Sequence, residues 1–75
     1  MEIGLHRVCP GDRGVVTRID TKPVLKQRLQ DFGFVPGTEV CCCYRGPGGS
    51  VTALGFRGTV VALRTKDLQD IRVCC

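Results

Sequence analysis

Cysteines are the residues of this sequence whose type suggests chemistry. The 75-residue chain has six of them, and five lie in two contiguous groups, Cys41-Cys42-Cys43 and Cys74-Cys75. Thiolates bind soft metal ions and take part in redox reactions. Disulfide-rich scaffolds belong to secreted proteins, and their cysteines are usually spread out so that each bridge closes a loop. The contiguous groups therefore indicate free thiols.

Zinc binding requires a spacing that these cysteines do not have. No two of them are three positions apart, so the Cys-x2-Cys knuckle is absent. On a regular strand Cys41 and Cys43 would lie about 6.6 Å apart, at about 3.3 Å per residue. Thiolates that share a tetrahedral zinc ion lie less than about 4 Å apart. A straight strand cannot bring this pair to one ion unless a bulge or a distant ligand helps.

We therefore assign no metal site and no cofactor, and leave thiolate binding of iron or zinc as an alternative. The residues that would contribute to such a site between neighbouring strands are Cys9, Cys41, Cys43 and Cys74, or His6. His6 is the only histidine, and no carboxylate and nucleophile can be assigned beside it for catalysis. The glycines near residue 48 are not followed by Lys-Ser or Lys-Thr, so no phosphate-binding loop is present. We expect a protein without enzymatic activity.

Length and composition indicate one small globular domain over residues 1–75. The hydrophobic fraction is 43% and the charged fraction 24%, which argues against disorder. No apolar run is long enough for a membrane span, and the first residues lack the apolar stretch of a secretory signal, so we expect a cytoplasmic protein. The net charge of +4 comes from scattered residues and predicts a mild attraction to acidic partners.

Turn signals divide the chain into short strands. Cys9–Asp12 and Val35–Thr38 each place Pro before Gly, the order that a type II turn prefers. The glycine-rich stretch Gly46–Ser50 predicts a hairpin tip. The expected strands are Gly14–Ile19, Glu39–Tyr44, Val51–Phe56, Thr59–Leu63 and Ile71–Cys74. So many short strands favour a small barrel, because an open sheet of this size would leave exposed edges.

One segment, residues 23–32, has the period of a helix instead. Its apolar stripe consists of Leu25, Leu29 and Phe32. Thr21 is predicted to cap the start, Pro23 suits the first turn, and Gly33 is placed to end the helix in a left-handed conformation. A short helix packed over one end of the barrel is expected.

Taken in order, these residues form one pattern. It consists of Leu5, Pro10-Gly11, Gly14, Val16, Ile19, Arg28-Leu29, Gly33-Phe34, Pro36-Gly37-Thr38, Val40, Arg57-Gly58, Ala62-Leu63-Arg64, Ile71 and Val73. The pattern resembles the FeoA family, whose members are small cytosolic partners of the bacterial ferrous-iron transporter FeoB. The resemblance covers nearly the whole chain, and the run from Arg28 to Thr38 is its most specific part.

This resemblance implies a mainly β fold, an SH3-like barrel of five or six strands with one short inserted helix. It also implies a soluble accessory protein without catalytic residues. The expected partner is FeoB, a membrane protein with a cytosolic GTP-binding domain, so contact with the membrane would be made only through that partner. The direction of the effect on FeoB and the oligomeric state are left open.

The cysteines depart from the family pattern, so the resemblance says nothing about their role. The pattern buries Val40, and strand alternation then places Cys42 and Tyr44 on the same inner face. Cys41 and Cys43 are expected to point outward. Along the last strand the expected inward residues are Ile71, Val73 and Cys75, with Cys74 outward.

A helix over one end of so small a barrel buries only part of its apolar face, and the rest would form a docking patch. The predicted partner-binding residues are Leu25, Arg28, Leu29, Gly33, Phe34, Pro36 and Arg57. An RNA-binding barrel is the alternative, because Gly11–Val16 is similar to the strand-opening turn of such proteins. We expect no nucleic acid as partner, because only four aromatic residues are present and at least two are needed in the core.

Overall fold

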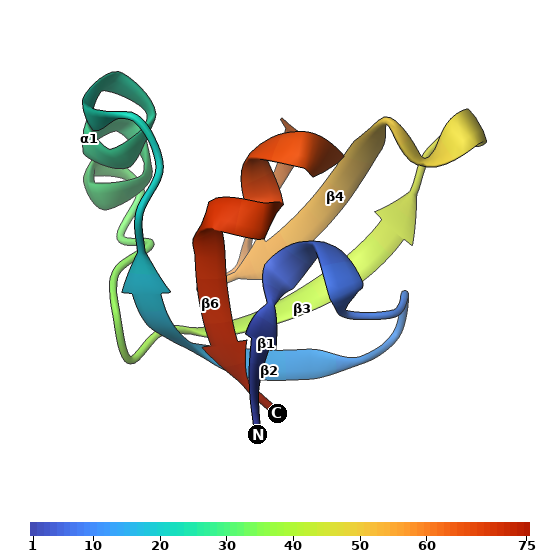
Figure 1. Cartoon of the computed structure of the whole chain (residues 1–75), viewed down its shortest axis with the longest axis horizontal. Coiled ribbons are helices and arrows are strands. Elements are labelled where there is room, and N and C mark those ends of the chain that lie inside the picture. The colour runs from blue at the N-terminus through green and yellow to red at the C-terminus, as the bar shows by residue number, and fades with distance from the viewer.

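The computed structural model describes all 75 residues and contains six strands, one α-helix and three short 3₁₀ helices (Figure 1). The strands are β1 (Glu2–Gly4), β2 (Arg13–Ile19), β3 (Glu39–Arg45), β4 (Val51–Phe56), β5 (Thr59–Arg64) and β6 (Ile71–Cys74). The helices are α1 (Pro23–Asp31), η1 (Leu5–Arg7), η2 (Pro47–Gly49) and η3 (Thr65–Asp70). All strand pairs are antiparallel, in the order β1-β6-β2-β3-β4-β5.

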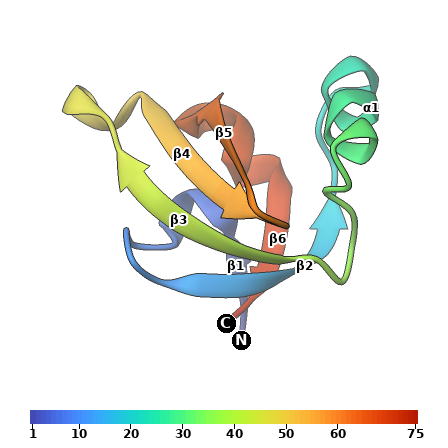
Figure 2. The same cartoon turned by 180° about the vertical axis from the view of Figure 1, so that it is seen from behind.

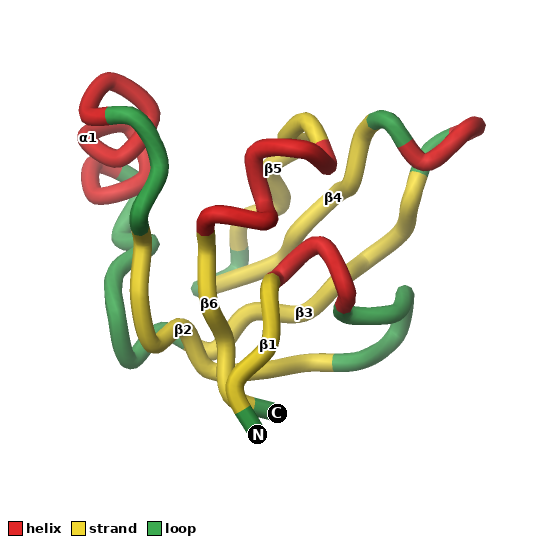
Figure 3. Tube along the Cα trace, in the orientation of Figure 1, coloured by secondary structure: helices red, strands yellow, loops and turns green.

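The sheet curls around one hydrophobic core, and α1 lies to one side of it (Figures 1 and 3). Thirteen buried residues form this core, and they come from the inner faces of β2, β3, β4 and β6, from helices and from connecting segments. Two of its aromatic rings, Phe34 and Phe56, meet edge to face with centroids 5.0 Å apart. The mainly β fold with one short helix near residues 23–32 is confirmed, and β1 is an additional strand that the sequence pattern did not reveal.

Both predicted Pro-Gly turns are present. The Asp12 N–H donates to the Cys9 carbonyl at 2.9 Å, and the Thr38 N–H donates to the Val35 carbonyl at 3.0 Å. The glycine in each turn has a φ above +90°, which only glycine adopts at low cost. Each turn therefore fixes the direction in which the next strand begins.

The start of α1 differs from the prediction. Lys22, not Thr21, is the N-cap residue, and no side chain caps the helix. Pro23 takes the first helical position, so the residue directly before it must be the cap. The Thr21 hydroxyl is instead buried without a hydrogen-bond partner.

The end of α1 follows the prediction and explains the packing of the residues around it. Gly33 has φ of +86°, its N–H donates to the Gln30 carbonyl at 2.9 Å, and the Phe34 N–H donates to the Leu29 carbonyl at 2.8 Å. These are the two hydrogen bonds of a Schellman motif, in which the residue after the glycine packs against the last helical turn. Leu29 and Phe34 are accordingly buried in the core.

Strand β3 contains a β-bulge that changes its side-chain alternation. Its register with β4 shifts between Cys42 and Tyr44, so Cys43 has no opposite residue. Val40 and Cys42 point into the core as predicted. Tyr44 is 60% exposed, contrary to the prediction, because the extra residue turns it to the outside. Cys75 is exposed as well, since β6 ends one residue earlier.

The two ends of the chain lie side by side (Figure 1). The amino group of Met1 is 3.4 Å from the Cys75 carbonyl oxygen, and the Cys75 N–H donates to the Met1 carbonyl at 3.2 Å. None of the helices combines the length and apolar content that crossing a bilayer would take.

Candidate functional site

Helix α1 presents an exposed stripe formed by Val24, Arg28 and Phe32. These residues are spaced by four along the helix and its C-cap, so they lie on one face over successive turns. Val24 is 76% exposed and Phe32 56% exposed, although both are apolar. Figure 2 shows that α1 stands beside the sheet with its outer face uncovered. The stripe is therefore apolar at both ends and cationic in the middle.

Arg57 extends this surface from the turn between β4 and β5. Arg57 and Gly58 both have positive φ, +51° and +75°, which is the type I′ pattern of a two-residue hairpin. The Arg57 side chain lies against Gly33, where an added Cβ would stand only 3.3 Å from the Arg57 Cδ atom. The glycine that ends α1 thus makes room for the arginine.

A groove of about 310 Å³ adjoins the stripe on the side of η3. Its charged lining residues are Lys22, Arg28, Arg64, Lys66, Asp67 and Asp70. The two ion pairs of the protein join Arg13 to Glu39 and Arg18 to Asp20, and neither contains a residue that lines this groove. Neither Arg28 nor Arg57 has an acidic partner within the chain. The charge of this face is thus free to pair with acidic groups of another molecule.

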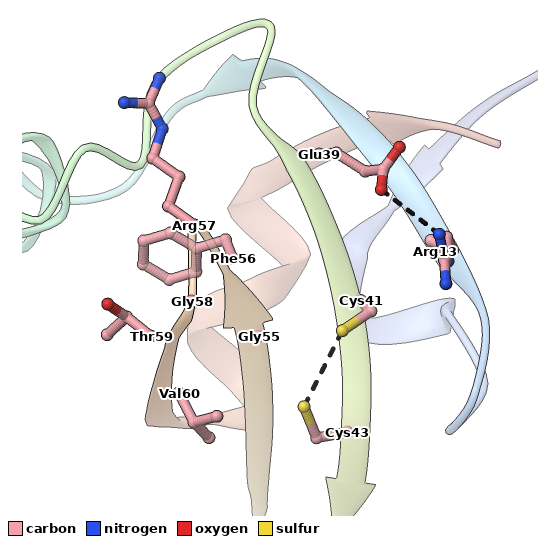
Figure 4. Close-up of a pocket in the computed structure, with 10 residues that line it drawn as sticks. All are labelled: Arg13, Glu39, Cys41, Cys43, Gly55, Phe56, Arg57, Gly58, Thr59 and Val60. Atoms are coloured by element: carbon pink, nitrogen blue, oxygen red, sulfur yellow. Dashed lines mark hydrogen bonds and ion pairs between the residues drawn. The ribbon is translucent and has the colours of Figure 1, made fainter.

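A second cleft, of about 440 Å³, contains a pair of thiols (Figure 4). Cys41 and Cys43 project from β3 into it, and their sulfur atoms are 3.9 Å apart. Gly55 of β4 lies beneath them, and Arg13, Glu39 and Arg57 also line the cleft. All six cysteines are free.

The other thiols named from the sequence do not join this pair. No group of three His, Cys, Asp or Glu side chains is placed to hold a metal ion. The Cys74 sulfur lies 3.9 Å from the amino group of Met1, at the far end of β6. The Nδ1 atom of His6 is buried without a hydrogen-bond partner.

Comparison with known proteins identifies the family. The sequence matches the FeoA domain family over residues 3–74, nearly the whole chain. This chain belongs to the FeoA family. No curated protein matches the sequence with significance.

Solved structures of FeoA proteins share this fold. The solution structure of FeoA from Chlorobium tepidum has a TM-score of 0.92 and 26% identity, over 96% of this chain and 69% of that one. The FeoA-like protein of Clostridium acetobutylicum has a TM-score of 0.83 and 32% identity, over 96% and 84%. FeoA of Stenotrophomonas maltophilia, solved with zinc and described as a prokaryotic SH3 domain protein, has a TM-score of 0.81 and 27% identity, over 97% and 88%. The predicted SH3-like fold and FeoA membership are confirmed.

Within this FeoA fold, the predicted docking residues divide into two groups. Leu29 and Phe34 are 1% and 0% exposed, so both lie in the core and not on the surface, where the Schellman motif packs them against each other's segment. The remaining residues lie at the surface or its edge: Leu25, Arg28, Gly33, Pro36 and Arg57. Val24 was missed, although its spacing of four from Arg28 and of eight from Phe32 could have revealed the stripe.

The aromatic residues of this FeoA chain do not form a stacking platform for RNA. Phe34 and Phe56 are buried in the core. Phe32 and Tyr44 are exposed, but they lie on α1 and β3, which are different elements. A nucleic-acid-binding barrel needs neighbouring aromatic faces on which successive bases stack.

The thiols of the cleft and the core have altered acidity. Burial raises the pKa of the Cys42 thiol, while the nearby Arg45 guanidinium acts in the opposite direction. Desolvation, the hydrogen bond with Cys41 and the charge of neighbouring thiolates raise the pKa of Cys43. Both groups are therefore protonated near neutral pH, which makes them poor nucleophiles.

Proposed function

We propose that this protein is a non-enzymatic accessory protein of bacterial ferrous-iron uptake. In this proposal it docks on the cytosolic part of the FeoB transporter and modulates the assembly or activity of that transporter. Membership of the FeoA family supports the pathway, and the Stenotrophomonas relative is described as a suggested activating factor of ferrous-iron transport. The protein would meet the membrane only through this partner.

The exposed stripe of Val24, Arg28 and Phe32 is the observation that carries the docking proposal. Exposed apolar side chains in a row, flanked by unpaired arginines, are typical of a surface that becomes buried in a complex. Aromatic and arginine residues supply most of the affinity at such surfaces. Phe32, Arg28 and Arg57 are thus the expected energetic centre, with the basic groove beside α1 receiving acidic side chains of the transporter.

An amide-shift NMR titration tests this proposal. The labelled protein is titrated with the soluble GTP-binding domain of the FeoB from the same organism, loaded with GDP or with a GTP analogue. We expect shifts confined to α1, the Gly33–Thr38 turn and the Arg57-Gly58 hairpin. Replacement Phe32→Ser should weaken binding by about tenfold, since loss of an interfacial aromatic costs more than about 1 kcal/mol.

A matched variant separates docking from a general loss of apolar surface. Tyr44→Ser also removes a mostly exposed aromatic ring, but from β3 on another part of the molecule. It should leave the affinity unchanged. Equal losses for Phe32→Ser and Tyr44→Ser would contradict the assignment of the surface. Absence of binding to the domain in both nucleotide states, and to the full-length transporter in detergent, would contradict the proposed partner.

A further inference from the structure

Cys41 and Cys43 lie on the same face of β3 and their thiols meet. The Cα atoms of residues two apart on a strand are about 6.6 Å apart, but their side chains can incline toward one another. The Cys41 and Cys43 sulfur atoms are 3.9 Å apart. They point toward one another into the cleft (Figure 4). The two residues thus form a dithiol on the surface of β3.

Gly55 on β4 provides the space in which this dithiol sits. An added Cβ at this position would stand 2.9 Å from the Cys43 sulfur and 3.0 Å from the Cys41 sulfur. Any side chain there would force the two sulfur atoms to move. Cys41 pairs directly with Gly55 across the β3–β4 ladder, so the pocket and the thiols are linked by the sheet register.

The sulfur atoms are 3.9 Å apart, near the separation of two thiolates on one metal ion. At about 2.3 Å per metal–sulfur bond, that separation is slightly less than about 4 Å for a tetrahedral ion and about 4.6 Å for a linear two-coordinate one, which a small rotation of the side chains provides. Zinc requires at least three protein ligands, and no third His, Cys, Asp or Glu side chain completes the pair. Cu(I) is a soft ion that selects thiolates and is satisfied by fewer ligands.

The charge of the cleft also suits a monovalent ion. Binding follows the balance Cu⁺ + 2 RSH → [Cu(SR)₂]⁻ + 2 H⁺, so both thiol protons leave and no electron is transferred. The product carries one negative charge. Arg13 and Arg57 line the cleft, with Glu39 paired to Arg13 at 3.5 Å. Arg57 has no acidic partner and adds a positive charge at the edge of the cleft, with its guanidinium directed away from the sulfur atoms (Figure 4).

We propose that Cys41 and Cys43 form a two-thiolate binding site for a soft monovalent metal ion, Cu(I). This site contains none of the three residues of the stripe on α1 and shares only Arg57 with the proposed docking surface. Cys43 is exposed and Cys41 half-buried, so an ion can enter directly from solvent. Both ligands of the ion lie on β3, and α1 takes no part in binding it.

Competition with a coloured Cu(I) chelator, under argon and with fully reduced protein, tests this proposal. The wild-type protein should withdraw one Cu(I) ion per chain. Cys41→Ser/Cys43→Ser should lose that ion. The matched variant Cys74→Ser/Cys75→Ser removes the same number of thiols and should retain it. Circular dichroism checks that each variant keeps its fold.

Gly55→Ala tests the geometry while keeping every thiol. Its methyl group would displace the sulfur atoms, and the affinity for Cu(I) should fall by about tenfold or more, as when the surroundings of a metal site are disturbed. If this variant fails to fold, Cys43→Ser alone serves as the second test, because the residue is exposed. Equal Cu(I) affinity in wild type and Cys41→Ser/Cys43→Ser would overturn the site. A tetrahedral cobalt spectrum that depends on the pair would overturn the choice of ion.

Discussion

Arg57 combines backbone strain with a surface role. A non-glycine residue in the left-handed region costs about 1–2 kcal/mol, and such strain is often found where a side chain must be held in place. Here the positive φ holds the guanidinium stem against Gly33, beside the exposed end of α1. The strained backbone of Arg57 thus lowers the stability of the fold and places the guanidinium beside α1.

Arg57→Asn should separate these two effects. Asparagine before glycine is the preferred pair for a type I′ turn, so we expect the free energy of unfolding to rise by about 0.5–1 kcal/mol. For a domain of this size that is an increase of several degrees in the unfolding temperature, at about 4–8 °C per kcal/mol. If the protein docks on FeoB as proposed, the same variant should bind that partner more weakly. Arg57→Lys keeps the strain and the charge, and a stability gain there would contradict this explanation.

The buried thiol of Cys42 predicts how stability depends on alkaline pH. Burial raises its pKa above the ordinary value of 9.0. Below that value both the folded and unfolded states hold the proton, so the full stability is present. As pH rises further the unfolded state ionises first, and the free energy of unfolding falls through the pKa of the folded state.

Urea unfolding of reduced protein between pH 7 and pH 10.5 measures this dependence, a range set around the ordinary thiol pKa. Cys42→Val keeps an apolar side chain in the core and should reduce the alkaline slope. Part of the slope remains, because the pKa of Cys43 is also raised. The same slope in wild type and variant would show that Cys42 is not the group responsible.

Among the elements, the end of β3 has side-chain hydrogen bonds from one arginine, Arg45, in addition to its backbone pairing with β2 and β4. The Arg45 Nη2 atom donates to the carbonyls of His6 and Val8, each at 3.0 Å, and its Nε atom donates to the Thr52 hydroxyl at 3.2 Å. These bonds join the end of β3 to η1, to the segment after it and to β4. From the sequence Arg45 was simply one of the scattered basic residues.

Arg45→Met should therefore destabilise the fold. It keeps most of the aliphatic packing but removes the donors from partly buried acceptors, and we expect a loss of about 2–3 kcal/mol in the free energy of unfolding. Arg45→Lys should recover only part of it, since one ammonium group cannot reproduce the fork of a guanidinium. Denaturant titrations measure both. A loss below about 0.5 kcal/mol for Arg45→Met would contradict the role.

Local signals predicted the elements well, whereas the placement of side chains depended on longer-range structure. Pro-Gly pairs identified both type II turns, and Gly33 identified the end of α1. Strand β1 has only three residues and exists through its pairing with β6, which a short local pattern cannot show. The same limit applies to the docking residues, since burial of Phe34 follows from packing after the helix end.

For the molecule as a whole, the thiol pair shows why a site can be missed by sequence spacing alone. The two cysteines are separated by one residue, and regular strand geometry argued against a shared ion. The approach of their sulfur atoms depends on how the two side chains incline on the folded strand, and the space depends on Gly55 of β4. The close sulfur atoms and the space at Gly55 occur together only in the assembled sheet.

Because its chain ends are adjacent, this fold is suited to insertion into another protein. Met1 and Cys75 leave the molecule at one point, while α1 lies away from them (Figures 1 and 2). The whole domain could be inserted into a surface loop of a host protein, because its two ends lie close enough together to replace a loop. In such an insertion α1 would project away from the points where the domain joins the host protein. Tags and tethers attached at either terminus would likewise leave the docking stripe uncovered.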